Sequence, residues 1–178
     1  ESIMETAKKH DLYVLSDEIY SEYATQSNDS LGVHLHSILK WRYEKSIITQ
    51  SFSKSHAMTG FRIGWVVAEP SIIEKMSKLQ ALSLTNVSEP IQYVALEAMM
   101  AETDENRELI KSRLEVLVKI AKDVGLEFIE PDGAMYLFAK TKYKNFDATK
   151  FSEKLLEHGV AIAPGEGFGD YKEFFRIT

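Results

Sequence analysis

The residues best suited to chemistry lie in one short stretch, from Ser51 to Trp65. Lys54 stands there beside the hydroxyls of Ser51 and Ser53, and Arg62 follows eight residues later between two glycines. A lysine amine forms a Schiff base with a carbonyl compound, and an arginine guanidinium grips phosphate through a planar fork of donors. Together they suit a carbonyl cofactor that bears a phosphate. The simpler alternative is a surface lysine in an ordinary turn.

A second candidate group precedes this stretch. Asp17 closes a short apolar segment, residues 12–15, that is typical of a buried parallel strand. Ligands of open α/β sheets bind outside the carboxyl ends of the strands, and a carboxylate there can hold a positive charge on a ligand ring nitrogen. Tyr20 follows three residues later and would point the same way if the chain turns helically. A turn cap for Asp17 and simple packing for Tyr20 are the alternatives.

The third candidate is near the end of the chain. Arg176 lies in an apolar segment, residues 174–178, which we expect to be a strand. Such an arginine either extends to the surface along its apolar stem or serves as a buried anchor for a carboxylate. The glycine-rich segment 164–169 lacks the order of a phosphate-binding motif, so we interpret it as a structural loop.

The lysine stretch requires a sheet to position it. Apolar runs over residues 46–50 and 64–68 predict strands on either side, and such a short connection joins antiparallel strands. Lys54 and Arg62 should therefore lie at the same end of the sheet. We further predict helices over 1–10, 71–81, 90–102, 104–124 (with Asp104 as its N-cap) and 148–158, a loop over 25–37, a hairpin of strands 126–129 and 135–139, and a strand over 160–163.

Composition excludes several classes of protein. The chain has 178 residues, a net charge of −6 and no cysteine, so thiolate metal sites and disulfides are excluded. No basic cluster predicts nucleic-acid binding, and no apolar run reaches the roughly 20 residues that cross a bilayer. We expect a cytoplasmic protein with neither nucleic acid nor membrane as a partner, and no metal. Because the chain lacks an initiator methionine and stops within a predicted strand, we also expect it to be a piece of a longer protein.

The motifs resemble those of a known family. The order Asp-Glu-Ile-Tyr from Asp17 to Tyr20, followed by Ser-Phe-Ser-Lys-Ser-His-Ala-Met-Thr-Gly-Phe-Arg-Ile-Gly-Trp over residues 51–65, resembles the class I/II, aspartate-aminotransferase-like group of fold-type I pyridoxal-phosphate aminotransferases. The resemblance implies an α/β fold. Residues 1–105 would form part of the large cofactor-binding domain, a mostly parallel sheet with helices, and residues 106–178 a smaller α+β C-terminal domain, with a bridging helix at about 104–124.

The same resemblance implies a role for each candidate residue. Lys54 would bond to the cofactor aldehyde and later carry the proton between the substrate α-carbon and the cofactor. Asp17 would pair with the protonated pyridine nitrogen, and Tyr20 would hydrogen-bond the ring oxygen. Phosphate binding would fall to Ser51, Ser53 and Arg62, and binding of the substrate α-carboxylate to Arg176.

Members of the group transfer an amino group between an amino acid and a 2-oxo acid, and they build their sites at a homodimer interface. They are also longer than this chain, so we expect the chain alone to be inactive. Two alternatives stay open. A carbon–sulfur lyase or a synthase of the same fold would use the same lysine and aspartate, and a degenerate domain would keep the fold without catalysis. The sequence does not specify which amino acid is the substrate.

Overall fold

The computed structural model describes residues 2–24 and 37–178, so most of the loop predicted over 25–37 lies outside the described residues. The chain divides into two compact units, Glu1–Arg107 and Glu108–Thr178, which we call the lysine unit and the C-terminal unit. The assignment of residues 1–105 and 106–178 to a large and a small domain stays a prediction. No helix among the described residues is long and apolar enough to span a membrane.

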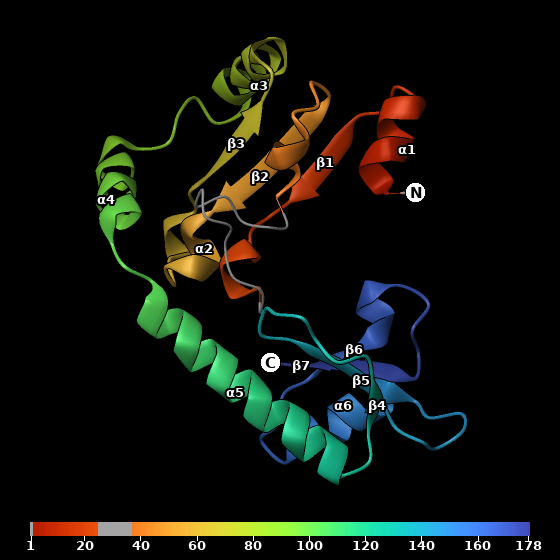
Figure 1. Ribbon diagram of the computed structural model, residues 1–178. Coiled ribbons are helices and arrows are strands. Elements are labelled where there is room, and N and C mark those ends of the chain that lie inside the picture. The colour runs from red at the N-terminus through yellow and green to blue at the C-terminus, as the bar shows by residue number, and fades with distance from the viewer. Residues whose placement is uncertain (1, 25–36) are drawn as a thin grey trace. The chain divides into compact units, whose positions relative to one another are not determined.

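The lysine unit is built on a three-stranded sheet with the order β1-β2-β3 (Figure 1). β1 (Val14–Asp17) runs parallel to β2 (Ser46–Ser51), and β2 runs antiparallel to β3 (Gly64–Ala68). The predicted antiparallel connection around the lysine is therefore confirmed. It contains a one-turn helix, α2 (Phe52–Ser55), and a 3₁₀ turn, η3 (Thr59–Phe61). Lys54 is thus on a helical turn and not in an irregular loop, because Ser51 caps that turn.

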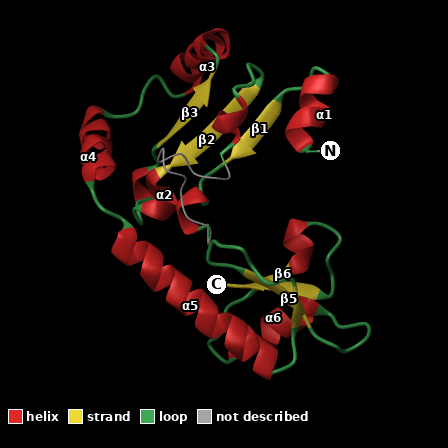
Figure 2. Ribbon diagram, viewed as in Figure 1, coloured by secondary structure: helices red, strands yellow, loops and turns green. Residues whose placement is uncertain are grey.

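Helices flank this sheet along the chain (Figure 2). α1 (Ile3–Lys9) precedes β1, and α3 (Pro70–Ser83) and α4 (Glu89–Met100) follow β3, close to their predicted positions. Two 3₁₀ turns, η1 (Ser21–Tyr23) and η2 (Ile38–Trp41), complete the unit. A small core of Phe52, Met58 and Ala95 joins the lysine turn to α4.

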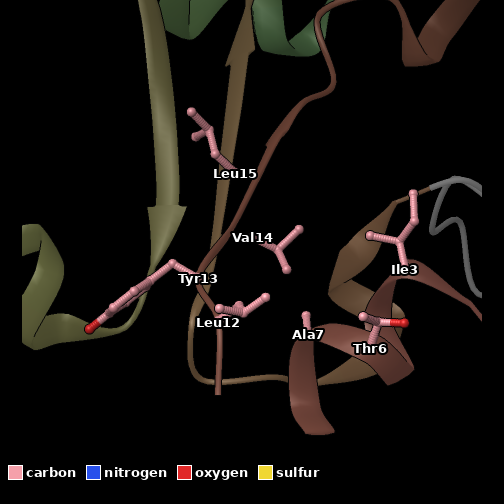
Figure 3. Close-up of a pocket in the computed structure, with 7 residues that line it drawn as sticks. All are labelled: Ile3, Thr6, Ala7, Leu12, Tyr13, Val14 and Leu15. Carbon is pink, nitrogen blue, oxygen red and sulfur yellow. The ribbon is translucent and has the colours of Figure 1, made fainter. Parts of the chain in front are cut away.

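The segment 12–15 departs from the prediction. The strand begins at Val14, and Leu12, Tyr13 and Leu15 are more than half exposed. β1 is the outer strand of the described sheet, and α1 covers only part of it, so the apolar run is not buried. In Figure 3, Val14 points toward Ile3 and Ala7 of α1, while Tyr13 points away from that helix.

The C-terminal unit contains a four-stranded antiparallel sheet with the order β4-β5-β7-β6. Its strands are β4 (Glu127–Phe128), β5 (Leu137–Lys140), β6 (Ala163–Pro164) and β7 (Phe174–Ile177). α5 (Asp104–Asp123) precedes the sheet, and α6 (Ala148–Glu157) lies between β5 and β6. The core gathers residues of α5, β5, α6 and β7. The predicted hairpin of β4 and β5 and the strand that carries Arg176 are confirmed.

Three local predictions for this part of the chain are wrong. Asp104 is the first helical residue and not the N-cap, because the Arg107 N–H already bonds to the carbonyl of Thr103. The predicted strand 160–163 reduces to Ala163–Pro164, which is where pairing with β7 begins. The segment 164–169, predicted as a loop, contains a 3₁₀ turn, η4 (Gly165–Phe168).

Candidate active site

The register of the three strands brings the candidate residues of the lysine unit to one end of the sheet. Asp17, the last residue of β1, pairs with Thr49 of β2. Ser51, the last residue of β2, pairs with Gly64, the first residue of β3. β1 and β2 are parallel, and β3 is antiparallel to β2, so the ends of β1 and β2 and the start of β3 lie at the same end of the sheet. Asp17 is at the end of β1, Lys54 follows β2 and Arg62 precedes β3.

Lys54 is half-buried on α2, with its amine near an aromatic ring. Its Nζ lies 6.0 Å from the centroid of the Tyr20 ring. Across residues 2–24 and 37–178, no carboxylate lies within ion-pairing distance of this amine, and it makes no hydrogen bond. An amine that is not engaged by a carboxylate is available to a carbonyl group.

Asp17 is exposed, and its contacts fit both readings of this residue. The Ile19 N–H and the Thr49 hydroxyl each donate to Oδ1 at 3.3 Å. The first of these bonds is the local turn of the simpler alternative. Both bonds engage the same oxygen, so they leave the carboxylate room to bind a cation at the end of the sheet.

The two serines before the lysine form a compact hydroxyl pair. Ser51 accepts the Ser53 N–H at 3.0 Å and thereby caps α2, while its hydroxyl lies 2.8 Å from the Ser53 hydroxyl and 2.9 Å from the Ile63 carbonyl oxygen. The Ser51 cap therefore has a structural role whatever else it binds.

Arg62 sits on the other side of this turn with an exposed side chain. Its backbone is left-handed, with φ of 53°, and its Nη1 donates to the Thr59 carbonyl at 2.9 Å. That bond uses one of the five donors of the guanidinium. Gly64, two residues on, fits closely, because a Cβ there would lie 2.6 Å from the Gln50 carbonyl oxygen.

Arg176 belongs to the C-terminal unit and is held between two aromatic rings. Its guanidinium carbon lies 4.3 Å from the centroid of the Tyr136 ring and 4.7 Å from that of Phe168. Its Nε is buried and has no hydrogen-bond partner among the described residues. A buried donor without a partner carries a desolvation cost, and a carboxylate is the anion that a guanidinium fork fits.

The sequence patterns did not single out several residues that support this site. The Tyr23 hydroxyl donates to the Lys54 carbonyl at 2.7 Å, and Gln50 Nε2 donates to the Ser21 hydroxyl at 2.8 Å. Tyr136 and Phe168 enclose Arg176 in the same unpredicted way. The one available signal was the spacing of Asp17, Tyr20 and Tyr23, which recurs every three residues.

Known proteins resemble this chain both in sequence and in structure. Residues 1–178 match the family described as aminotransferase class I and II. Aspartate aminotransferase of Thermotoga maritima is 33% identical over 171 residues, which are 94% of this chain and 43% of that protein. Aromatic-amino-acid aminotransferase 2 of Thermococcus litoralis is 33% identical over an alignment of 187 positions, which covers 100% of this chain and 47% of that protein. The solved structure of the Thermotoga maritima enzyme superposes with a TM-score of 0.87 at 32% identity, covering 98% of this chain and 44% of that one.

The fold is therefore that of the fold-type I aminotransferases, an α/β class whose cofactor is pyridoxal phosphate. The chain belongs to the family of class I and II aminotransferases. It spans less than half the length of the curated relatives it matches.

The cofactor and the described residues fit each other chemically. An amine that no described carboxylate engages, a carboxylate with a free oxygen, and paired hydroxyls lie at one end of one sheet, as a phosphorylated pyridine aldehyde requires. The guanidinium of Arg176 offers, in the other unit, a buried donor that lacks a partner among the described residues.

Proposed function

We propose that this chain is part of a pyridoxal-phosphate aminotransferase, one that moves an amino group between an amino acid and a 2-oxo acid. The observation that carries the proposal is the lysine amine without a carboxylate partner among the described residues, at the same sheet end as Asp17. The substrates named for relatives at similar identity differ, aspartate in one and aromatic amino acids in another. The proposal therefore stops at the α-amino acid and 2-oxo acid pair.

Each residue would contribute one function. Asp17 would hold the protonated ring nitrogen of the cofactor, and Tyr20 would donate to the ring oxygen. Ser51, Ser53 and Arg62 would bind its phosphate. When bound, pyridoxal phosphate supplies a conjugated ring that accepts the electron pair released when the substrate α-C–H bond breaks.

The remaining roles concern the substrate. Lys54, a half-buried amine, would take the proton from the substrate α-carbon and deliver it to the cofactor carbon that bears the aldehyde. Arg176 would bind the α-carboxylate through its planar fork of donors, with Tyr136 and Phe168 restricting where the guanidinium lies. Excluding water strengthens this charge pairing, because the local dielectric constant is lower.

We also propose that the full-length protein is a cytoplasmic homodimer, as the family resemblance implies. Sedimentation of the full-length protein checks this proposal, and a fully active monomer would contradict it.

The experiment that tests the function uses the full-length protein and its Lys54→Ala variant. We expect borohydride reduction to fix the cofactor on the peptide that carries Lys54 in the wild type, together with formation of a new amino acid from a 2-oxo acid. Both should disappear in the variant, because the amine that would bond to the cofactor aldehyde is removed. Lys78→Ala, an exposed lysine paired with Glu74, is the matched control and should keep both.

Two outcomes would contradict the proposal. One is cofactor fixed on another peptide in the wild type. The other is release of a keto acid with ammonia and no new amino acid, which would indicate a lyase of the same fold.

A further inference from the structure

The helical turn that carries Lys54 cannot hold its own shape. α2 has four residues, and isolated helices of this length are not stable in water. Its closing bonds are long, 3.2 Å from the His56 N–H to the Phe52 carbonyl and 3.3 Å from the Ala57 N–H to the Lys54 carbonyl. Ala57 also takes a left-handed backbone with φ of 54°. The position of the lysine therefore depends on contacts from elsewhere in the unit.

The shortest hydrogen bond on the Lys54 backbone comes from Tyr23. The phenol donates to the Lys54 carbonyl at 2.7 Å across 31 residues of sequence. Tyr23 is 8% exposed and the bond is partly buried, so competing water has limited access to it. Burial, and to a lesser extent the Glu22 carboxylate, raises the pKa of Tyr23, so the phenol keeps its proton at neutral pH.

Tyr23 also ends the segment that carries the other cofactor residues. Residues 17–23 run beside residues 49–54 and are joined to them along their length. The Thr49 hydroxyl donates to Asp17, the Glu18 N–H donates to the Thr49 carbonyl at 2.9 Å, and Gln50 donates to Ser21. The bond from Tyr23 closes this series at the lysine itself.

We propose that Tyr23 is a positioning residue, which holds Lys54 at a fixed place relative to Asp17 and Tyr20 through its bond to the Lys54 carbonyl. The inference rests on the proposed function, since it concerns the same lysine. Its rival is a purely structural role, in which the Tyr23 ring fills space and the hydroxyl does nothing. Only the positioning role needs the hydroxyl, so a substitution that removes the hydroxyl and keeps the ring separates the two roles.

The test compares Tyr23→Phe and Tyr23→Leu with the wild type in the full-length protein. We expect Tyr23→Phe to bind cofactor and to keep KM, while kcat falls roughly 2- to 10-fold, the net worth of one hydrogen bond. The kinetic isotope effect with an α-deuterated amino acid should rise, because proton transfer by a less fixed Lys54 becomes slower. Tyr23→Leu loses the ring as well, so its free energy of unfolding should be lower than that of Tyr23→Phe.

A second readout does not depend on activity. In the protein without cofactor, amide hydrogen exchange of the peptide over residues 52–58 should speed up in Tyr23→Phe by a similar factor. Tyr143→Phe, at a 75% exposed tyrosine of the other unit, is the matched control and should change neither readout.

The outcomes separate the two ideas. If Tyr23→Phe keeps the wild-type kcat, isotope effect and exchange rate while Tyr23→Leu does not, the ring alone matters and the positioning role is overturned. If the wild-type protein transfers no amino group, the proposed function fails, and the exchange measurement still decides whether the Tyr23 hydroxyl holds the lysine turn.

Discussion

In the C-terminal unit, Leu137, Ala139 and Ala148 have no exposed surface, whereas in the lysine unit α3 has no buried residue and α4 has only Ala95. In the C-terminal unit, the sheet packs against α5 and α6 and encloses the core. The lysine unit has two helices that are almost wholly exposed, α3 and α4, whose exposed large apolar side chains include Leu79, Leu82, Tyr93, Leu96, Met99 and Met100.

The difference shows where each unit obtains its stability. The C-terminal unit has a closed core of its own, including Phe175 in contact with Phe146 and Phe151. The lysine unit has a small core of Phe52, Met58 and Ala95 beside the lysine turn. Its outer strand, β1, is only partly covered, and a pocket lies between β1 and α1 (Figure 3). Substitutions should therefore cost most at fully buried positions, such as Leu137 of the C-terminal unit, and least on α3 and α4 of the lysine unit.

The largest effect is expected for Leu137→Ala. This side chain is fully buried at the start of β5, so removing it leaves a cavity and should lower the free energy of unfolding by about 2–5 kcal/mol. Urea denaturation, with hydrogen exchange of the β5 and β7 peptides, measures the loss. Leu156→Ala on α6, at a 64% exposed leucine, is the control and should cost less than about 0.5 kcal/mol. Equal losses would mean that the core is not closed as described.

A smaller and pH-dependent effect is expected at Asp147, the N-cap of α6. Its carboxylate accepts the Lys150 N–H at 3.0 Å, and this bond, chiefly, lowers the pKa of Asp147. A lowered pKa in the folded state adds stability above the ordinary value, about 4, and loses it as pH falls through the lowered value. Asp147→Ala should therefore lower Tm at neutral pH.

Asp147→Asn provides the control for this cap. Asparagine keeps the acceptor but does not titrate. The Tm of the wild type relative to that of Asp147→Asn should fall as the pH drops from 7 to 3. A difference that stays constant over this range would exclude a charge contribution from the cap.

The smallest effect is expected for Leu82→Ala on α3. The side chain is 87% exposed, so the free energy of unfolding of this chain should change by less than about 0.5 kcal/mol. Ile48→Ala on β2, 2% exposed, is the matched substitution inside the same unit and should cost about 2–5 kcal/mol. A Leu82 loss as large as that of Ile48 would show that α3 is packed in solution, and the contrast between the units would disappear.

Sequence patterns predicted correctly those helices, strands and turns that depend only on neighbouring residues. The period of the α5 and α6 helices, the apolar runs of β2 and β3 and the turn between β4 and β5 all follow from neighbouring residues. They failed at residues 12–15 and 160–163, because burial and strand length depend on what lies alongside. The roles of Asp17, Tyr20, Ser51, Ser53, Lys54, Arg62 and Arg176 stay predictions, although the strand register places those that precede Arg176 at one sheet end.

The sequence by itself determined which functional groups are present, because an amine, a carboxylate, hydroxyls and guanidinium groups are fixed by the residue types. It also favoured a shared sheet end for Lys54 and Arg62. The 13 residues between the two predicted strands are enough for a parallel crossover as well, so the antiparallel pairing of β2 with β3 decided this point. Only the tertiary structure decided which atoms hold these groups in place. The bond from Tyr23 to the Lys54 carbonyl and the two rings around Arg176 join residues far apart in the chain. Such contacts depend on distances that are set only once the sheets have formed.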